Sequence, residues 1–169
     1  MSSPDLFISP AKRVFDYAKP AWKYEVSTSK GSYFIAHNNG GGKFTFLDLF
    51  VSPADVRGTG LGTRLVSAMT RLALEKSAAN IEGVVTSQHT LKIFRRLFAE
   101  ERLSFFDQGV HLPMVTEQAI CSLERAEEYE DNLEHRELGV WTRVDLTGLN
   151  NRDLEKAKKA RWNEFHLKP

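Results

Sequence analysis

The sequence predicts a mixed α/β domain, and three features of the chain carry that prediction. Between residues 22 and 51, three segments alternate apolar and polar side chains and are separated by turn residues, which is typical of an antiparallel meander. A glycine-rich loop follows, and after it the apolar residues take helical spacing. A further apolar segment completes a β-α-β unit, in which we expect two parallel strands with a right-handed connection.

The N-terminal part of the chain supplies the meander. Prolines punctuate the first twenty residues, and we expect one short helical piece around Ala11–Tyr17. The two turn signals are Lys30–Gly31 and the asparagine- and glycine-rich stretch Asn38–Gly42. The strands expected around them are Trp22–Ser29, Ser32–Asn38 and Lys43–Val51.

The central part supplies the β-α-β unit. The helix after the glycine loop is indicated by apolar residues at helical spacing, namely Leu65, Val66, Met69, Leu72 and Ala73. Ile81–Ser87 reads as a short buried strand, and Thr90–Leu103 as a helix with a basic face.

The C-terminal part adds further strands and helices. We expect a strand within Ser104–Leu112, a helix over Thr116–Glu134, a strand over Leu138–Leu146 and a terminal helix over Asn150–Leu167. The sequence contains no internal repeat and no linker-like stretch, so we expect one domain over residues 1–169.

Composition excludes several classes of protein. Apolar residues make up 41% and charged residues 27%, which is ordinary for a globular chain. The net charge of +1 gives no global attraction to nucleic acid or membrane, so we expect neither as a partner. Cys121 is the single cysteine, and neither His-x-His nor Cys-x-x-Cys spacing occurs, so we expect no disulfide within the chain and no metal site. Without a signal-peptide pattern or an apolar span, the expected location is cytoplasmic.

The glycine loop fails two nucleotide-binding patterns. Its alternate glycines are Gly58, Gly60 and Gly62. A Walker A loop requires lysine and then serine or threonine after its last glycine, but Thr63 and Arg64 follow in the wrong order. A dinucleotide fingerprint requires a third glycine where this chain has Thr63 or Leu65.

A different anion fits the loop. Successive backbone N–H groups from Gly58 to Thr63 can form a concave nest for a diphosphate at the positive end of the following helix. Glycine at alternate positions removes Cβ atoms that would hold the phosphates away. A plain strand-to-helix turn is the alternative, but such a turn needs one glycine and not three.

The pattern R-x-x-G-x-G, from Arg57 to Gly62, lies between a strand and a helix and resembles the pyrophosphate-binding signature of the GNAT superfamily of N-acetyltransferases. The preceding stretch LFVSPADVRG is similar to that family's strand-and-loop entry, and the order of elements agrees from Trp22 to Phe106, about half of the chain. The resemblance implies a mixed, strongly twisted sheet of about six to seven strands flanked by helices. It also implies acetyl-coenzyme A as the cosubstrate.

The resemblance further implies which residues contact the coenzyme. Backbone groups of Leu49, Phe50 and Val51 would pair with the pantetheine arm, and an N–H there would polarise the thioester carbonyl. The pyrophosphate would be held by Arg57, Gly58, Thr59, Gly60, Leu61, Gly62 and Thr63.

The family's second motif, N-x-x-A-x-x-L-Y, aligns with the segment that begins at Ser87. Ser87 takes the asparagine position and Phe94 the tyrosine position, with Thr90 and Ile93 between them. Many GNAT enzymes use that tyrosine to protonate the leaving thiolate, which Phe94 cannot do. We expect its ring to pack on the pantetheine arm, while another residue or water supplies the proton.

The base that deprotonates an amine acceptor is a separate question. Asp48 is the nearest candidate, because it is an acid within the apolar run FTFLDLFV. The alternative is that Asp48 faces solvent or ends a row of hydrogen bonds. His37, His89 and His111 are weaker candidates, since single histidines at the ends of elements are commonly structural.

Three charged segments bear on partners. Between Glu124 and Glu137 the chain carries seven carboxylates and two arginines, which fits either attraction of a cationic amine or a solvated helix face. Lys92, Arg95 and Arg96 would pair with the phosphates or face water. The basic terminal segment weakly indicates RNA or an acidic partner.

The resulting hypothesis is transfer of an acetyl group to a primary amine, of a small molecule or a protein, by direct attack in a ternary complex. Two alternatives stay open: a non-catalytic acyl-coenzyme A binding module, and a GNAT-type toxin that acetylates aminoacyl-tRNA. The inserted helix after Phe106 would shape the acceptor site or a homodimer contact.

Overall fold

The computed structural model describes residues 5–16, 19–38, 40, 42–55, 60–107, 110–112, 117–128, 139–150 and 165–167. The strands are β1 (Leu6–Ile8), β2 (Lys12–Asp16), β3 (Lys19–Ser27), β4 (Tyr33–Asn38), β5 (Lys43–Phe50), β6 (Asn80–Val85), β7 (Leu103–Asp107), β8 (Val110–Leu112), β9 (Val140–Asp145) and β10 (Phe165–Leu167). The helices are α1 (Leu61–Glu75), α2 (Gln88–Leu97) and α3 (Glu117–Glu128), with a short 3-10 helix, η1 (Glu100–Arg102).

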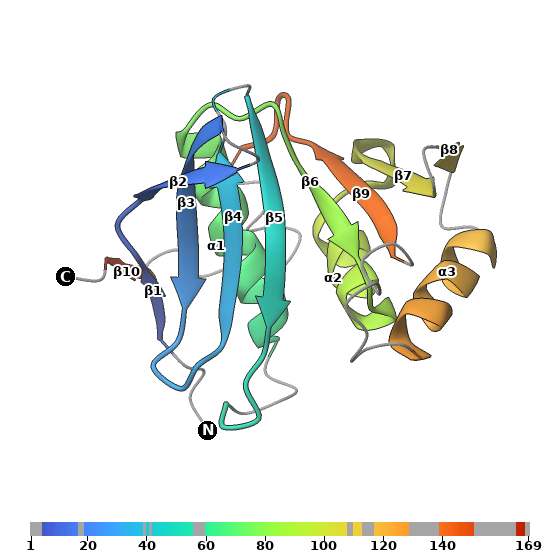
Figure 1. Ribbon diagram of the computed structural model, residues 1–169, viewed down its shortest axis with the longest axis horizontal. Helices are drawn as coiled ribbons and strands as arrows, with labels where there is room; N and C mark the ends of the chain where they lie inside the picture. Colours follow the sequence, from blue (N-terminus) through green and yellow to red (C-terminus); the bar gives the residue numbers. More distant parts are fainter. Residues whose placement is uncertain are drawn as a thin grey trace.

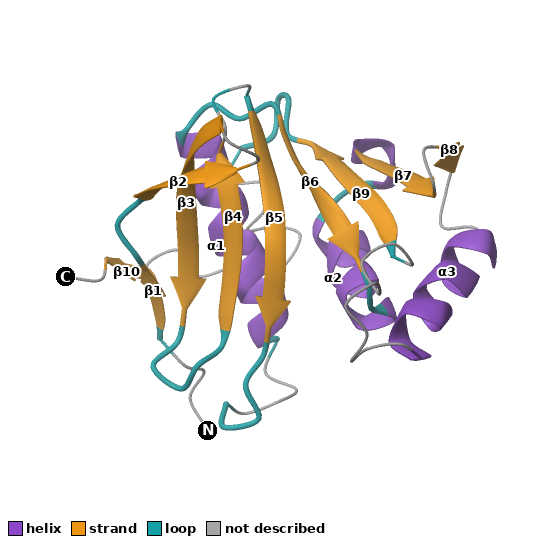
Figure 2. Cartoon of the chain, viewed as in Figure 1, coloured by secondary structure: helices purple, strands orange, loops and turns teal. Residues whose placement is uncertain are grey.

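The described strands form one mixed sheet in the order β10-β1-β3-β4-β5-β6-β9-β7-β8, and β2 pairs with β3. Strand direction turns markedly between β3 and β9, and α1 lies behind β3, β4 and β5 (Figures 1 and 2). The expected fold class, a twisted α/β sheet flanked by helices, is confirmed. The ten described strands exceed the six or seven expected because β1, β2, β8 and β10 add three to five residues each.

The meander and the β-α-β unit are both confirmed. β3, β4 and β5 pair antiparallel in sequence order, and β5 pairs parallel with β6 across α1. The helix forms where the apolar spacing predicted it, because its buried face carries the residues that pack against the sheet, among them Leu65, Val66 and Met69.

A β-bulge in β5 sets which side chains face the helices. Ala36 pairs with Phe46, but Ile35 pairs with Asp48, so Leu47 is the extra residue. Side chains alternate between the two faces of a strand, and one extra residue reverses the alternation. Phe46 therefore faces the helices before the bulge, and beyond it Leu49 does, in register with the buried Phe34.

β5 and β6 diverge soon after they pair. Their parallel register covers only Lys43–Thr45 and Asn80–Glu82, and the two strands separate beyond it (Figure 1). An aromatic cluster packs between β5 and α2 at this point. The Phe94 ring of α2 stacks between Phe46 at 5.4 Å and Phe98 at 6.1 Å between ring centroids.

Two sequence-based expectations near the termini are wrong. The short helix expected around Ala11–Tyr17 is strand β2, which alternates its side chains along the edge of β3 between two prolines. Phe165–Leu167, expected to be helical, form β10 in parallel register with β1. In both places the segment forms hydrogen bonds with the open edge of a distant strand. Prediction from local residue preferences does not include such pairing. Residues 151–164 of the expected terminal helix lie outside the described residues.

Three expected element bounds also differ. The helix expected to reach Leu103 ends at Leu97, where Phe98 adopts an extended backbone, and Leu103 already belongs to β7. The strand expected within Ser104–Leu112 is an antiparallel pair, β7 and β8. Helix α3 is described to Glu128, and the rest of its expected range lies outside the described residues.

No helix in the described part of the chain is both long and apolar enough to cross a membrane.

Candidate active site

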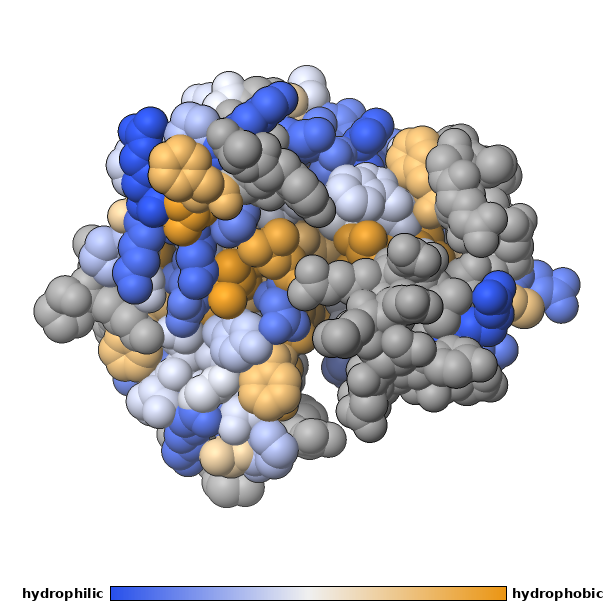
Figure 3. All heavy atoms as spheres, in the orientation of Figure 1, coloured by the Kyte–Doolittle hydropathy of each residue, from blue (hydrophilic) through white to orange (hydrophobic). Residues whose placement is uncertain are grey.

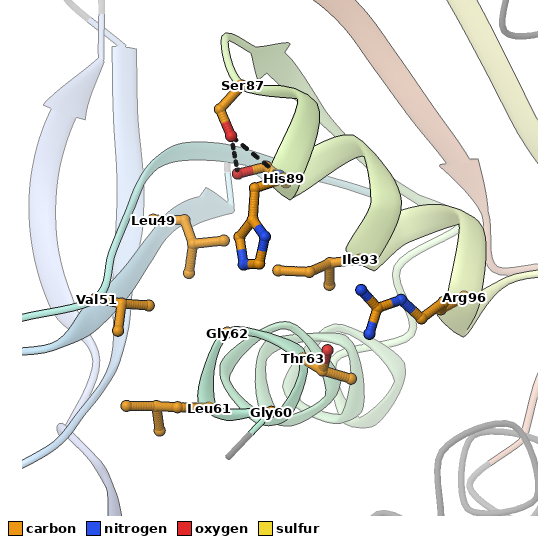
Figure 4. Close-up of a pocket in the computed structure, with 11 residues that line it drawn as sticks. Leu49, Val51, Gly60, Leu61, Gly62, Thr63, Ser87, His89, Ile93 and Arg96 are labelled. Carbon is orange, nitrogen blue, oxygen red and sulfur yellow. Dashed lines mark hydrogen bonds between the residues drawn. The ribbon is translucent and has the colours of Figure 1, made fainter. Parts of the chain in front are cut away.

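A cavity of about 580 Å³ opens beside the end of β5, between the first turns of α1 and α2 (Figure 4). Its volume is in the range of small-molecule and cofactor sites, roughly 300–1,000 Å³. The residues that line it are Leu49, Val51, Gly60, Leu61, Gly62, Thr63, Ser87, His89, Thr90, Ile93 and Arg96.

Most of the predicted coenzyme-contacting residues that are described gather around this cavity. Those that line it are Leu49, Val51, Gly60, Leu61, Gly62, Thr63 and Ser87. Arg57, Gly58 and Thr59 lie outside the described residues. Phe50 and Phe94 are described, but their side chains do not line the cavity.

The first turn of α1 is open toward the cavity. Gly60 caps the helix in the left-handed conformation, with φ 75°, and no described side chain caps it. The first intrahelical bond runs from the Arg64 N–H to the Gly60 carbonyl at 3.0 Å, so the preceding amides Leu61–Thr63 have no acceptor within the helix. The first turn carries no acid, so its positive end is not neutralised locally.

The two described glycines of the loop differ in what an added side chain would meet. Gly60 has a positive φ, and a Cβ added there would meet nothing within 4 Å, so its backbone conformation alone calls for glycine. A Cβ at Gly62 would lie 2.8 Å from Ile93 Cδ1, so glycine there lets α1 and α2 approach each other beside the cavity. The sequence suggested one reason, close approach to an anion, for both.

The Ser87 side chain caps the N-terminus of α2. Its Oγ accepts the Thr90 N–H at 3.0 Å and its hydroxyl lies 3.2 Å from Thr90 Oγ1. This arrangement is a standard N-cap, which explains why α2 begins beside the cavity.

Four further lining residues lie on α2, and of these only Arg96 had been expected, as one of two alternatives, to pair with the phosphates. His89, Ile93 and Arg96 recur at helical spacing and point into the cavity, with Thr90 beside them (Figure 4). The signal that could have found them is this spacing of i, i+4 and i+7 downstream of the Ser87 cap. Arg96 forms no ion pair with any carboxylate in the described ranges, whereas Arg95 lies 3.9 Å from Glu100.

Phe94 is part of the hydrophobic core. It has no exposed surface, and it stacks on Phe46 and Phe98 behind the cavity wall. The expectation that its ring packs on a bound pantetheine arm is therefore wrong, because the ring is already enclosed. Its neighbour Ile93 lines the cavity instead.

Asp48 lies on the sheet face opposite the cavity. The bulge at Leu47 places it in register with Ile35, and its Oδ2 accepts the hydroxyl of Tyr33 at 2.8 Å. This hydrogen bond is the main cause that raises the pKa of Tyr33 above 10.0, with smaller contributions from partial burial and from the charges of Asp48 and Glu25. Asp48 thus faces solvent, which was the alternative to a catalytic role, and it is hydrogen-bonded. Its carboxylate remains accessible to a ligand.

The weaker histidine candidates are dispersed. His89 lines the cavity, His37 lies in β4, and His111 lies in β8 at the far end of the sheet. Among the described residues, no three His, Cys, Asp or Glu side chains are placed to hold a metal ion.

A buried polar network anchors the start of the loop. The Asp55 carboxylate, 3% exposed, accepts hydrogen bonds from the Thr28 hydroxyl at 2.7 Å and from the Ser32 hydroxyl. Ser32 Oγ in turn accepts the Ser52 N–H at 2.8 Å. The turn between β3 and β4 therefore holds the chain where it leaves β5 toward α1.

No protein-family model matches the chain, and no curated protein matches it. Several solved structures are similar to it at low identity. A Bacillus subtilis acetyltransferase in complex with CoA is 14% identical, over 75% of this chain and 77% of that chain, with a TM-score of 0.41. An IAA acetyltransferase from Bacillus cereus is 12% identical, over 83% and 99%, with a TM-score of 0.44. A nourseothricin acetyltransferase is 14% identical, over 85% and 89%, with a TM-score of 0.45.

Proposed function

We propose that this protein is a GNAT-like N-acetyltransferase that moves an acetyl group from acetyl-coenzyme A to a primary amine. The observation that carries the proposal is the cavity at the N-terminus of α1, which no described side chain caps, beside the point where β5 and β6 diverge. A helix N-terminus with free amides favours an anion, and the neighbouring walls favour an apolar arm. A diphosphate attached to pantetheine combines these two chemistries.

Different described residues would contact different parts of coenzyme A. The amides of Leu61–Thr63 would hold the diphosphate, and the Arg96 guanidinium on the facing helix would add a positive charge. Leu49, Val51 and Ile93 offer apolar surface for the arm. The predicted contacts of Arg57, Gly58 and Thr59 belong to the same proposal, because those residues directly precede Gly60 in the chain.

The reaction we propose is direct attack in a ternary complex. Asp48 takes one proton from the arriving ammonium, and the free amine attacks the thioester carbonyl. A backbone N–H within Leu49–Val51 stabilises the charge that develops on the carbonyl oxygen. The new C–N bond forms as the C–S bond breaks, and the nitrogen loses its second proton to water.

The departing thiolate does not require the missing tyrosine. A free thiol has a pKa of about 8.5, so a thiolate leaves readily and takes its proton from water. Phe94 is enclosed in the core and takes no part in this step. The single cysteine is consistent with a cytoplasmic enzyme, which we include in the proposal.

The deciding experiment compares substitutions at two glycines with the same backbone conformation. Gly60 and Gly148 both have φ 75°, and an added Cβ would meet nothing within 4 Å at either position. Gly60→Asp places a carboxylate at the α1 N-terminus and should weaken coenzyme A binding about tenfold or more in calorimetry. Gly148→Asp introduces the same strain away from the cavity and should leave binding unchanged.

The neutral variant Gly60→Asn separates charge from strain, because asparagine tolerates the left-handed conformation. It should bind coenzyme A more tightly than Gly60→Asp does. Equal binding by wild type and Gly60→Asp would overturn the proposal. Thiol release from acetyl-coenzyme A, measured against panels of polyamines, aminoglycosides and peptides, then distinguishes an enzyme from a non-catalytic binding module.

A further inference from the structure

A second cluster of exposed functional groups lies on the sheet face opposite α1. It comprises Tyr33, Asp48 and Phe50, at the ends of β4 and β5. The Tyr33 hydroxyl donates to Asp48 Oδ2 at 2.8 Å, and the Tyr33 and Phe50 rings lie 5.5 Å apart with an interplanar angle of 36°. Figure 3 views this face and shows apolar side chains gathered near its middle.

The β5 bulge brings these groups close to the coenzyme cavity. If β5 alternated regularly through Leu47, with no bulge, Asp48 would share the face of Phe44 and Phe46 and point into the core. With it, Asp48 joins Tyr33, while the next residue, Leu49, lines the cavity on the other side. The Asp48 carboxylate and the cavity-lining Leu49 are therefore neighbours in the chain, on opposite faces of β5.

The chemistry of the cluster is that of a cation site with apolar walls. Tyr33 engages Oδ2 of Asp48 and leaves Oδ1 for a ligand. Within the described part of the chain no lysine or arginine forms an ion pair with Asp48, and Glu25 on β3 adds negative charge nearby. Phe50 is 43% exposed and Leu47 is 44% exposed, so both offer apolar surface beside the carboxylate.

We propose that Tyr33, Asp48 and Phe50 form the acceptor subsite, and that it selects a primary ammonium joined to an apolar or aromatic body. Asp48 binds the ammonium, the two rings contact the cation and the adjoining carbon atoms, and Tyr33 holds the carboxylate in position. This inference rests on the proposed acetyl transfer. The acceptor and the coenzyme then approach β5 from opposite faces of the sheet.

The test uses phenethylammonium as the probe and phenethyl alcohol as its uncharged counterpart, each titrated by calorimetry and by backbone NMR. We expect saturable binding of the ammonium probe, with shifts centred on the ends of β4 and β5, and no binding of the alcohol. Asp48→Asn should weaken the probe about tenfold, and Phe50→Ala and Tyr33→Phe about threefold each.

Matched controls separate recognition from folding. Tyr24→Phe makes the same change as Tyr33→Phe on the core face of the neighbouring strand, where Tyr24 stacks on Phe44. Phe15→Ala truncates another exposed ring, on β2. Both controls should leave probe binding unchanged. Absence of probe binding, or binding that Asp48→Asn and Phe50→Ala do not weaken, overturns the inference.

Coenzyme A binding, measured on the same samples, keeps the two proposals distinguishable. A protein that binds coenzyme A but not the probe retains the proposed function and loses this acceptor subsite. A protein that binds the probe at β4 and β5 but does not bind coenzyme A loses the proposed function, and the cluster remains an ammonium site.

Discussion

A Cβ atom at Gly83 would lie 2.5 Å from Cδ2 of Phe46 and 2.6 Å from the Phe46 carbonyl oxygen. Gly83 is in β6 and Phe46 is the last residue of β5 before the bulge. Glycine therefore lets β5 approach β6 closely at the point where the two strands begin to diverge, and the Phe46 ring stacks on Phe94 and lies tilted against Phe34.

This contact predicts the effect of Gly83→Ala. The methyl group must displace both a ring and a backbone oxygen, so we expect a loss of about 1–3 kcal/mol in the free energy of unfolding. Urea denaturation measures it, and Gly83→Ala should cost less in a Phe46→Ala background, though not nothing, because the contact with the backbone oxygen persists. A Gly83→Ala variant as stable as wild type would contradict the close approach.

Arg96 and its neighbour Arg95 provide a matched pair on α2. Arg96 lines the cavity, whereas Arg95 lies 3.9 Å from Glu100. If the cavity holds a diphosphate, Arg96→Ala should weaken coenzyme A binding about three- to tenfold, and it should reduce the salt dependence of binding. Arg95→Ala should change neither quantity. Calorimetry at low and high salt makes the comparison, and equal effects of the two variants would place the phosphates elsewhere.

Phe94→Tyr tests whether a tyrosine at the position that the GNAT resemblance points to can serve the proposed reaction. Phe94 has no exposed surface, so the added hydroxyl would enter an aromatic core without a hydrogen-bond partner. We expect a cost of about 1–3 kcal/mol in denaturant unfolding and no gain in thiol release. Faster thiol release from this variant would show that the side chain reaches the reacting atoms, contrary to its enclosed position.

Periodicity predicted the central fold because α1 and the meander are long and regularly patterned. It failed at β2 and β10, whose short segments are fixed by pairing with distant strand edges. The glycine loop predicted much of the cavity lining, yet the facing residues on α2 depend on how two helices pack. Neither the bulge at Leu47 nor the anchoring of Asp55 by Thr28 and Ser32 has a local signature, because each arises from contacts between strands.

The hydrogen bond between Tyr33 and Asp48 has a consequence for titration. Since it raises the pKa of Tyr33 in the folded chain, the neutral phenol is the favoured form there. Its contribution to stability is fully present below the ordinary pKa of 10.0 and is lost as the pH rises through the raised value. We expect Asp48→Asn to move the Tyr33 transition down toward 10.0, because it weakens the hydrogen bond that the carboxylate accepts from the phenol and also removes the charge that opposes ionisation. The ultraviolet absorbance of tyrosinate, as the difference between each protein and its Tyr33→Phe counterpart, isolates this transition.

Asp145→Asn, at an exposed carboxylate that accepts the Thr147 N–H, is the control and should leave the transition in place. A Tyr33 transition that does not respond to Asp48→Asn would show that the two side chains are not hydrogen-bonded in solution.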